Sequence, residues 1–193
     1  TGTNNVAVGA QAMDANTTAS YNTAVGYNAL TDNTTGANNV AIGENAAANV
    51  TTGGYNTAVG NTTLFDNTTS SHNTALGYAA LNNATSEKNT SIGSNSLVYL
   101  TTGANNCALG YAALSACTTA SGNCAMGYIA LTNNTTGERN TAFGAYSGDG
   151  MSTASDNTVV GYAALTAVNT GGSNCAFGAN SLGANTSGAQ NTA

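Results

Sequence analysis

The chain of 193 residues has no proline, no tryptophan, a single histidine and very few charged side chains. Asp, Glu, Lys and Arg make up 5% of the sequence, whereas about 25% is usual for soluble domains. Disordered chains are typically rich in charge and proline, so this composition does not indicate disorder. The two basic residues, Lys88 and Arg139, stand against eight acidic ones, for a net charge of −6. Nucleic acid and anionic membrane surfaces are therefore disfavoured as partners, because both are bound through clustered Lys and Arg.

The chain also lacks any apolar run near the roughly 18 residues that a membrane span requires, so we predict no membrane insertion in this segment. What it has instead is one unit repeated throughout. An asparagine recurs every 17 residues, apart from one interval of 16 that ends at Asn89. The eleven complete units begin at Asn5, Asn22, Asn39, Asn56, Asn73, Asn89, Asn106, Asn123, Asn140, Asn157 and Asn174. We predict a single repeat domain over residues 1–193 and, because both ends fall within a unit, a fragment of a longer fibre.

Within the unit, counted from this asparagine, position 4 is always apolar, position 5 is always glycine and position 9 is usually leucine. Three successive units show this with Asn22, Val25, Gly26 and Leu30, then Asn39, Ile42 and Gly43, then Asn56, Val59 and Gly60. Positions 2 to 4 predict a short strand in which Thr23 and Val25 face inward and Ala24 faces a close neighbour. A second short strand is predicted at positions 7 to 9, with Leu30 inward. Turns are expected at the glycine and at the Asn-Thr-Thr-Gly segment.

The unit is too short, and too rich in Gly, Asn and Thr, for a helical repeat. We predict an all-β protein in which each unit is one coil of a parallel β-solenoid. Eleven coils spaced about 4.8 Å apart would form a rod on the order of 50 Å long. Because each coil has few bulky apolar residues, we expect oligomerisation to supplement the thin core, with the small residue at position 3 allowing close approach of another sheet or subunit. The asparagine column is expected to form a hydrogen-bonded ladder or to supply left-handed backbone angles.

The segments NNVAVG, NNVAIG, NTAVG and NTSIG resemble the head repeats of trimeric autotransporter adhesins, the YadA-like head. Those repeats carry an asparagine, alternating small and aliphatic residues, and then glycine. The longer unit NTAVGYNALTDNTTGAN is similar to repeats of phage tail fibres and related surface proteins. The resemblance covers essentially the whole chain, and it implies a left-handed β-roll, a side-by-side homotrimer and a role as a stalk or adhesive head. The unit is longer than the usual adhesin-head repeat, and no coiled-coil neck, membrane anchor or chaperone domain is visible.

Residues suited to catalysis are sparse. His72, the one histidine, falls at the turn position 17. The acidic residues share no repeat position that would pair carboxylates for acid–base chemistry; they are Asp14, Asp32, Glu44, Asp66, Glu87, Glu138, Asp149 and Asp156. We therefore predict no enzyme, no catalytic residue and no cofactor.

The segment SGDGMSTASD, residues 147–156, departs most from the pattern, because Gly148 replaces the inward leucine of position 9. Asp149 and Asp156 suggest a calcium or ligand site there. Calcium requires more oxygen ligands at closer spacing, so a remodelled turn is favoured over a metal site.

The cysteines are predicted to be packing residues. Cys107, Cys124 and Cys175 occupy position 2, on the predicted inner face, and Cys117 occupies position 12. A buried free cysteine behaves as a small hydrophobic side chain. The alternative is a disulfide between Cys107 and Cys124, since stacked coils bring their Cα atoms within range. No Cys-x-x-Cys motif occurs, which disfavours a zinc or redox site.

Two columns of side chains are candidate binding surfaces. Position 6 holds an aromatic column made of Tyr27, Tyr78, Tyr111, Tyr128 and Tyr162. These rings suit stacking on a glycan, but covering the edge of the roll or sealing a subunit contact is the favoured role. Threonines at positions 13 and 14 raise the possibility of ice binding, although adjacent side chains point to opposite faces and threonine is a natural turn residue.

The sequence thus favours a structural or adhesive fibre segment of a surface adhesin or phage tail fibre, acting as a rigid spacer or receptor-contacting rod. We expect it to be extracellular, on a cell surface or a virion tail, and to form a homo-oligomer, most simply a trimer. A cell-surface glycan or protein is the expected receptor. The alternatives are an ice- or glycan-binding solenoid, and the subunit of an extracellular filament that stacks end to end through the open edges of its terminal coils.

Overall fold

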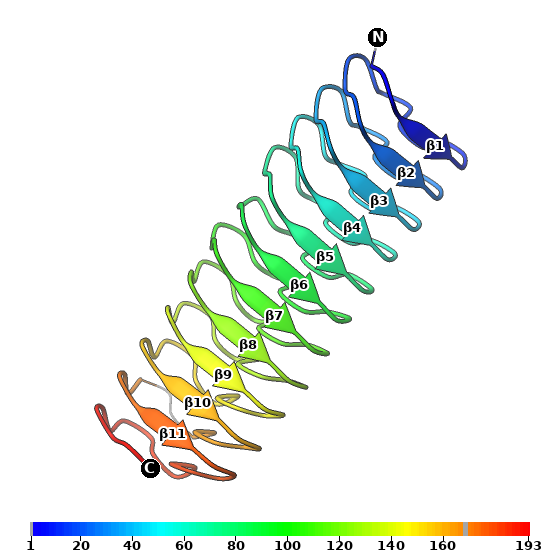
Figure 1. Ribbon diagram of the computed structural model, residues 1–193. Helices are drawn as coiled ribbons and strands as arrows, with labels where there is room; N and C mark the ends of the chain where they lie inside the picture. The colour runs from blue at the N-terminus through cyan, green and yellow to red at the C-terminus, as the bar shows by residue number, and fades with distance from the viewer. Residues whose placement is uncertain (1, 168–169) are drawn as a thin grey trace.

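The computed structural model describes residues 2–167 and 170–193, which form a rod of stacked coils (Figure 1). One strand of each coil pairs in parallel with the strand of the next, giving an 11-stranded sheet in chain order. The strands are β1 Val6–Val8, β2 Thr23–Val25, β3 Val40–Ile42, β4 Thr57–Val59, β5 Thr74–Leu76, β6 Thr90–Ile92, β7 Cys107–Leu109, β8 Cys124–Met126, β9 Thr141–Phe143, β10 Thr158–Val160 and β11 Cys175–Phe177. The predicted parallel β-solenoid is confirmed, and coils are numbered here after their strands. Among the described residues, no helix is long and apolar enough to cross a membrane.

The strands pair strictly in register, so that each residue lies on its equivalent one coil away. The shorter interval between coils 5 and 6 does not disturb this, because Thr74 still pairs with Thr90. The missing residue is taken from the turn that precedes Ser86, which lies where other coils have position 15. Its main-chain carbonyl accepts a 2.9 Å hydrogen bond from Nδ2 of Asn73, as position 15 does in neighbouring coils. The deletion is therefore absorbed near Glu87, as the sequence predicted.

The strand side chains point the opposite way from the prediction: position 3 points into the coil, and positions 2 and 4 point outward. Ala24, at position 3, is fully buried, whereas Thr23 and Val25 on either side of it are half-exposed. The same holds along the sheet, where Ile42 is 40% exposed. Val25, Ile42 and Val59 therefore lie on the outer face of the solenoid rather than in its core.

Position 3 is small because two walls of the same coil meet there. In coil 6, the alanines usual at positions 3 and 8 are both replaced by serine, and the Oγ atoms of Ser91 and Ser96 lie 2.6 Å apart. Ser91 Oγ also donates to the carbonyl of Ser96, at 2.8 Å. Positions 3 and 8 thus pack against each other across the coil. The expectation that position 3 allows a second subunit to approach was wrong.

The second wall contains no strand among the described residues. Positions 7 and 9 adopt left-handed backbone angles instead, with φ of 55° at Asn28 and 51° at Leu30. Hydrogen bonds between coils continue through this wall: the Asn28 N–H donates to the carbonyl of Ala10, and the Leu30 N–H donates to that of Ala46, both at 3.1 Å. These bonds help to offset the cost of left-handed angles in residues other than glycine, which is about 1–2 kcal/mol each. Leu30 points inward, as predicted, and is fully buried.

The large core side chains form two columns. Position 9 contributes Leu30, Leu64, Leu81, Leu97, Leu114, Leu131 and Leu165, and position 12 contributes Val50, Leu100, Cys117 and Met151, all of them fully buried. Coils 2, 4 and 8 have a buried asparagine at position 12 instead, namely Asn33, Asn67 and Asn134. In coil 8, Nδ2 of Asn134 donates to the carbonyl of Gly137 at 2.8 Å, and its Oδ1 accepts from the Gly137 N–H at 3.0 Å. The core therefore accepts either an apolar residue or a locally satisfied amide at position 12.

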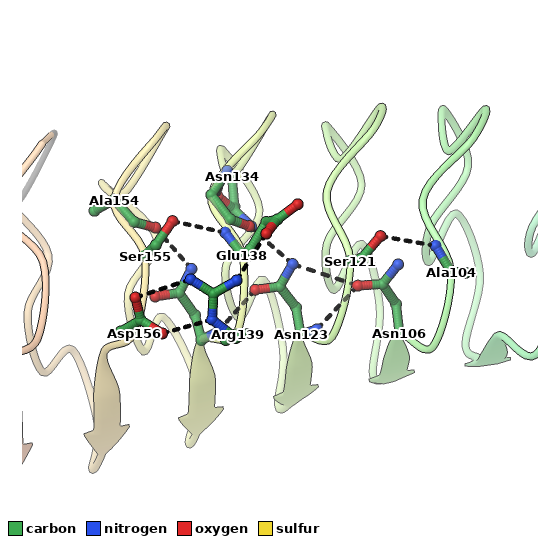
Figure 2. A network of polar contacts seen from close by, with 12 residues as sticks. Ala104, Asn106, Ser121, Asn123, Asn134, Glu138, Arg139, Ala154, Ser155 and Asp156 are labelled. Atoms are coloured by element: carbon green, nitrogen blue, oxygen red, sulfur yellow. Dashed lines mark hydrogen bonds and ion pairs between the residues drawn. The ribbon is translucent and has the colours of Figure 1, made fainter.

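The asparagine ladder is confirmed. It is made mainly of side-chain to main-chain bonds, and several coils add an amide to amide bond, as from Nδ2 of Asn123 to Oδ1 of Asn106 at 3.3 Å. The Asn123 N–H donates to Oδ1 of Asn106 at 3.0 Å, and Nδ2 of Asn123 donates to the carbonyl of Gly137 at 2.9 Å (Figure 2). The next coil repeats the pattern, with the Asn140 N–H donating to Oδ1 of Asn123 at 2.9 Å. The left-handed angles predicted for this column lie one residue earlier, at position 17, where Asn38 has φ of 60°.

The glycine at position 5 is required for two reasons. Its φ is strongly positive, 133° at Gly60, a region that essentially only glycine occupies. A Cβ atom on Gly60 would also lie 2.5 Å from the carbonyl oxygen of Gly77 in the next coil. The column therefore marks the place where successive coils stack through bare backbone.

The ladder can be tested with Asn123→Ala. The substitution leaves the buried N–H of Asn140 without an acceptor, so the free energy of unfolding should fall by about 1–3 kcal/mol. Urea denaturation followed by circular dichroism measures this. Asn83→Ala is the matched control, because the Asn83 side chain is half-exposed and makes no hydrogen bond within the described residues; it should change stability by less than about 0.5 kcal/mol. Equal effects of the two substitutions would show that the ladder does not stabilise the stack.

Candidate functional site

The outward face of the sheet is the most unusual surface of the rod. We call it the sheet face and define it as the side chains at positions 2 and 4 of strands β1 to β11. It contains no charged residue. Position 4 places a bulky apolar side chain on it in every coil, and the largest are well exposed, Phe143 at 52% and Phe177 at 73%. Position 2 is threonine in six coils and valine or cysteine in the other five. Because monomeric proteins rarely expose apolar side chains in one unbroken column of this length, the sheet face is a candidate interaction surface.

The tyrosines predicted at position 6 border the sheet face and lie outside the coil. Tyr27, Tyr78, Tyr111, Tyr128 and Tyr162 are all about half-exposed. In coils 7 to 10, the rings of Tyr111, Tyr128 and Tyr162 form a continuous run with that of Tyr146. We call these four rings the tyrosine ladder. Tyr111 stacks on Tyr128 with centroids 5.5 Å apart and planes 16° apart. Tyr146 then contacts Tyr128 and Tyr162 edge-on, with centroids 5.4 and 5.8 Å away.

Tyr146 was missed by the sequence analysis because it occupies position 7 rather than position 6. Its ring nonetheless lies between those of Tyr128 and Tyr162 and completes the ladder. The loss of hydration, then the neighbouring Tyr128 and Tyr162, raise the pKa of its phenol. The ladder rings cover part of one another, and this reduces the area left for stacking on a sugar. The geometry thus favours a contact surface over a row of separate sugar-stacking platforms.

Three of the cysteines lie on the sheet face rather than in the core. Cys107, Cys124 and Cys175 are half-exposed free thiols, whereas Cys117 is buried, as predicted. Cys107 and Cys124 are register partners on β7 and β8. Burial raises the pKa of the Cys117 thiol to about 11, so it is an unreactive packing group. The prediction of an inner-face position was wrong for the other three because the strands face the opposite way.

The threonines at positions 13 and 14 differ in role. Position 13 hydroxyls donate to the carbonyl of position 13 in the next coil, as Thr34 does to Thr51 at 3.1 Å and Thr101 does to Thr118 at 2.8 Å. Position 14 is exposed, as at Thr35. The two columns therefore do not present a matched pair of free hydroxyl rows, which weakens the basis for ice binding at these positions.

The charged and titratable groups are scattered along the turns. His72 is exposed and stacks on Tyr55, with centroids 5.0 Å apart. Arg139 donates from Nε and Nη2 to the two carboxyl oxygens of Asp156, at 2.7 and 3.0 Å, and from Nη1 to Glu138 at 2.8 Å (Figure 2). These hydrogen bonds lower the pKa of Asp156. Burial raises the pKa of Asp149.

No calcium-type cluster forms around these carboxylates. Within the part of the chain that the structure describes, no three His, Cys, Asp or Glu side chains gather as metal ligands. Both oxygens of Asp156 are already engaged by Arg139. The structure instead shows how coil 9 is remodelled. Gly148 is buried, with φ of 63°, and the space of the missing leucine is bordered by Met151 and Leu131.

Comparison of the chain with protein-family models, curated protein sequences and solved structures finds no match. The parallel β-solenoid therefore rests on the structure itself. The likeness to adhesin heads and tail-fibre repeats continues as a hypothesis carried by the repeat sequence.

The remodelling of coil 9 predicts that substitutions at Gly148 and Met151 have non-additive effects on the free energy of unfolding. A Cβ on Gly148 would lie 2.9 Å from Cδ2 of Leu131 and 3.1 Å from Sδ of Met151, so Gly148→Leu alone should destabilise the protein by about 1–3 kcal/mol. Met151→Asn alone removes buried apolar volume and should cost about 2–5 kcal/mol. The double variant recreates the Leu and Asn pair of coil 8, so its cost should be clearly smaller than the sum. Urea denaturation of the three variants measures the coupling, and additive costs would refute the account.

Proposed function

We propose that this chain is a structural segment of an extracellular fibre, in which copies of the rod associate side by side through the sheet face. The observation that carries the proposal is the exposed apolar column of position 4 along all eleven described strands, on a face that holds no charge. Depletion of charged residues is the compositional signature of an interface core. The parent protein would be a surface adhesin or a phage tail fibre, on a cell surface or a virion tail, as the repeat resemblance implies.

The size of the sheet face supports this assignment. Eleven rungs about 4.8 Å apart give a length on the order of 50 Å, and the span from position 2 to position 6 adds a width of about 13 Å. The resulting area is on the order of 650 Å² per chain. A stable interface of standard size buries about 600–1,000 Å² per partner. The sheet face with its bordering tyrosines falls at the lower end of that range.

A second copy of the chain is the occupant that fits the sheet face best. Only another solenoid of the same pitch presents bulky side chains at the same interval over the same length. Columns at positions 2 and 4 of one copy then pack into those of another without loss of register. The described surface holds no pocket for a small molecule, and a flat repetitive face suits a flat repetitive partner. A homotrimer is the arrangement that the resemblance implies.

Such an assembly would act as a rigid spacer or as a receptor-contacting rod. Every coil is bonded to the next through the sheet, the second wall and the asparagine ladder, so bending requires many hydrogen bonds to distort together. The reach of the fibre is then set by the number of coils.

Glycan binding is the second candidate function, and the exposed tyrosine ladder is the observation that favours it. Incubation of the protein with a glycan array tests for glycan binding, with a Tyr111→Ser, Tyr128→Ser double variant as control. Binding that this double variant loses would make the ladder a receptor site. Thermal hysteresis of the intact protein tests ice binding in the same way, and a flat result would remove that alternative.

The self-association proposal predicts the effect of a charge on the sheet face. Light scattering coupled to size exclusion should give a mass that is a multiple of the 18.8 kDa chain mass, three times that mass for the trimer. Phe143→Asp should shift the particle towards the monomer, because it buries a carboxylate in an apolar contact. Tyr99→Asp is the matched control, since Tyr99 is 59% exposed at position 11, away from the sheet face, and it should leave the mass unchanged. A native protein that is monomeric at high micromolar concentration would overturn the proposal.

A further inference from the structure

Three sulfur-containing residues share the sheet face in coils 7 and 8. Cys107 and Cys124 are register partners on β7 and β8, so their Cα atoms lie about 4.8 Å apart. Met126 follows Cys124 by two residues, which places its thioether on the same outer face, and both side chains are half-exposed. No other pair of neighbouring coils has two cysteines at position 2. This clustering is therefore specific to coils 7 and 8.

The geometry points to a site for a soft monovalent metal ion, with Cu(I) as the best match, held by the sulfurs of Cys107, Cys124 and Met126. Thiolate and thioether ligands select soft ions such as Cu(I) and zinc, and a structural zinc ion requires four ligands, one more than these three residues supply. The cluster offers only sulfur. A long, flexible methionine side chain can adjust its sulfur towards the two thiols.

The rung spacing suits a bridging ion better than a disulfide. With bonds of roughly 2.3 Å, the length of zinc–thiolate bonds, one ion would hold two sulfurs up to about 4.6 Å apart, close to the spacing of neighbouring strands. A disulfide requires the sulfurs to approach to about 2.05 Å and the Cβ atoms to about 3.8 Å, which would pinch two strands held in register by their hydrogen bonds. Both thiols are free in the structure.

Binding is a simple ligand exchange in which no electron is transferred. Each thiol releases its proton to solvent, and the two thiolate sulfurs each donate an electron pair to the ion. The product is a bis-thiolate of net charge −1, with the neutral thioether of Met126 as a third donor. Because only the thiolate form binds the ion, proton release accompanies binding at neutral pH.

The site draws all three ligands from a single chain, and it lies on the sheet face, where its bound charge of −1 would oppose the proposed association. It is tested with the reduced protein under anaerobic conditions, by competition for Cu(I) with a chromogenic Cu(I) chelator. We expect one Cu(I) per chain. Cys107→Thr and Cys124→Thr should each lower the affinity by roughly 100-fold or more, and Met126→Leu by about tenfold. Threonine is the common residue of this column, so these variants should keep the β-sheet circular dichroism.

Cys175→Thr is the matched control. Cys175 occupies the same column, but its register partner on β10 is Thr158, so it has no neighbouring thiol and its loss should not change Cu(I) binding. Equal losses from Cys175→Thr and Cys107→Thr would overturn the site, as would unchanged binding in Cys107→Thr. Failure to bind Cu(I) in the native protein and after refolding with the ion present would overturn it too. Light scattering on the same samples reports association separately, so each proposal can fail without the other.

Discussion

The structure depends on one repeated contact, the buried amide of the position-1 asparagine. Its oxygen accepts the main-chain N–H of the next asparagine along the stack, and its nitrogen donates to the position-15 carbonyl of its own coil. A buried N–H without an acceptor costs about 1–3 kcal/mol, so each coil must place its asparagine directly over the last. This requirement fixes the length of the coil. It also explains how coil 5 loses a residue: the turn before Ser86 shortens, and the ladder from Asn73 to Asn89 stays intact.

A second constraint is the thinness of the coil. The two walls meet through alanine at positions 3 and 8, so there is room for only the leucine column and the residue at position 12 as bulky core groups. The aliphatic and aromatic residues of position 4 cannot fit inside and are placed on the outer face. What resembles a core column in the sequence is therefore a surface column. The same geometry that makes the core small makes the outer face apolar.

The period, the parallel stacking and the inward leucine were predictable because each follows from spacing and residue type. The direction in which the strand faces was not. Strict alternation shows that Thr23 and Val25 share one face, but it does not say which face is inside. The signal that decides this is the uniformity of position 3, since a surface residue would vary in size. The left-handed angle at Leu30 was equally hidden, because leucine disfavours it and only the hydrogen bonds between coils make it tolerable. The misplaced cysteines follow directly from the reversed face.

Register stacking also determines where specificity can arise on such a rod. A side chain that differs in one coil has no like neighbour. When the same residue type occurs at one position of two adjacent coils, the two side chains lie side by side, because equivalent positions are about 4.8 Å apart. Tyr111 and Tyr128 form a stacked pair in this way, and Cys107 and Cys124 become register partners. Both clusters lie in coils 7 and 8, whereas the asparagine and glycine columns there are the same as elsewhere. The invariant columns build the rod, and coils 7 and 8 are where its outer face departs most from a plain spacer.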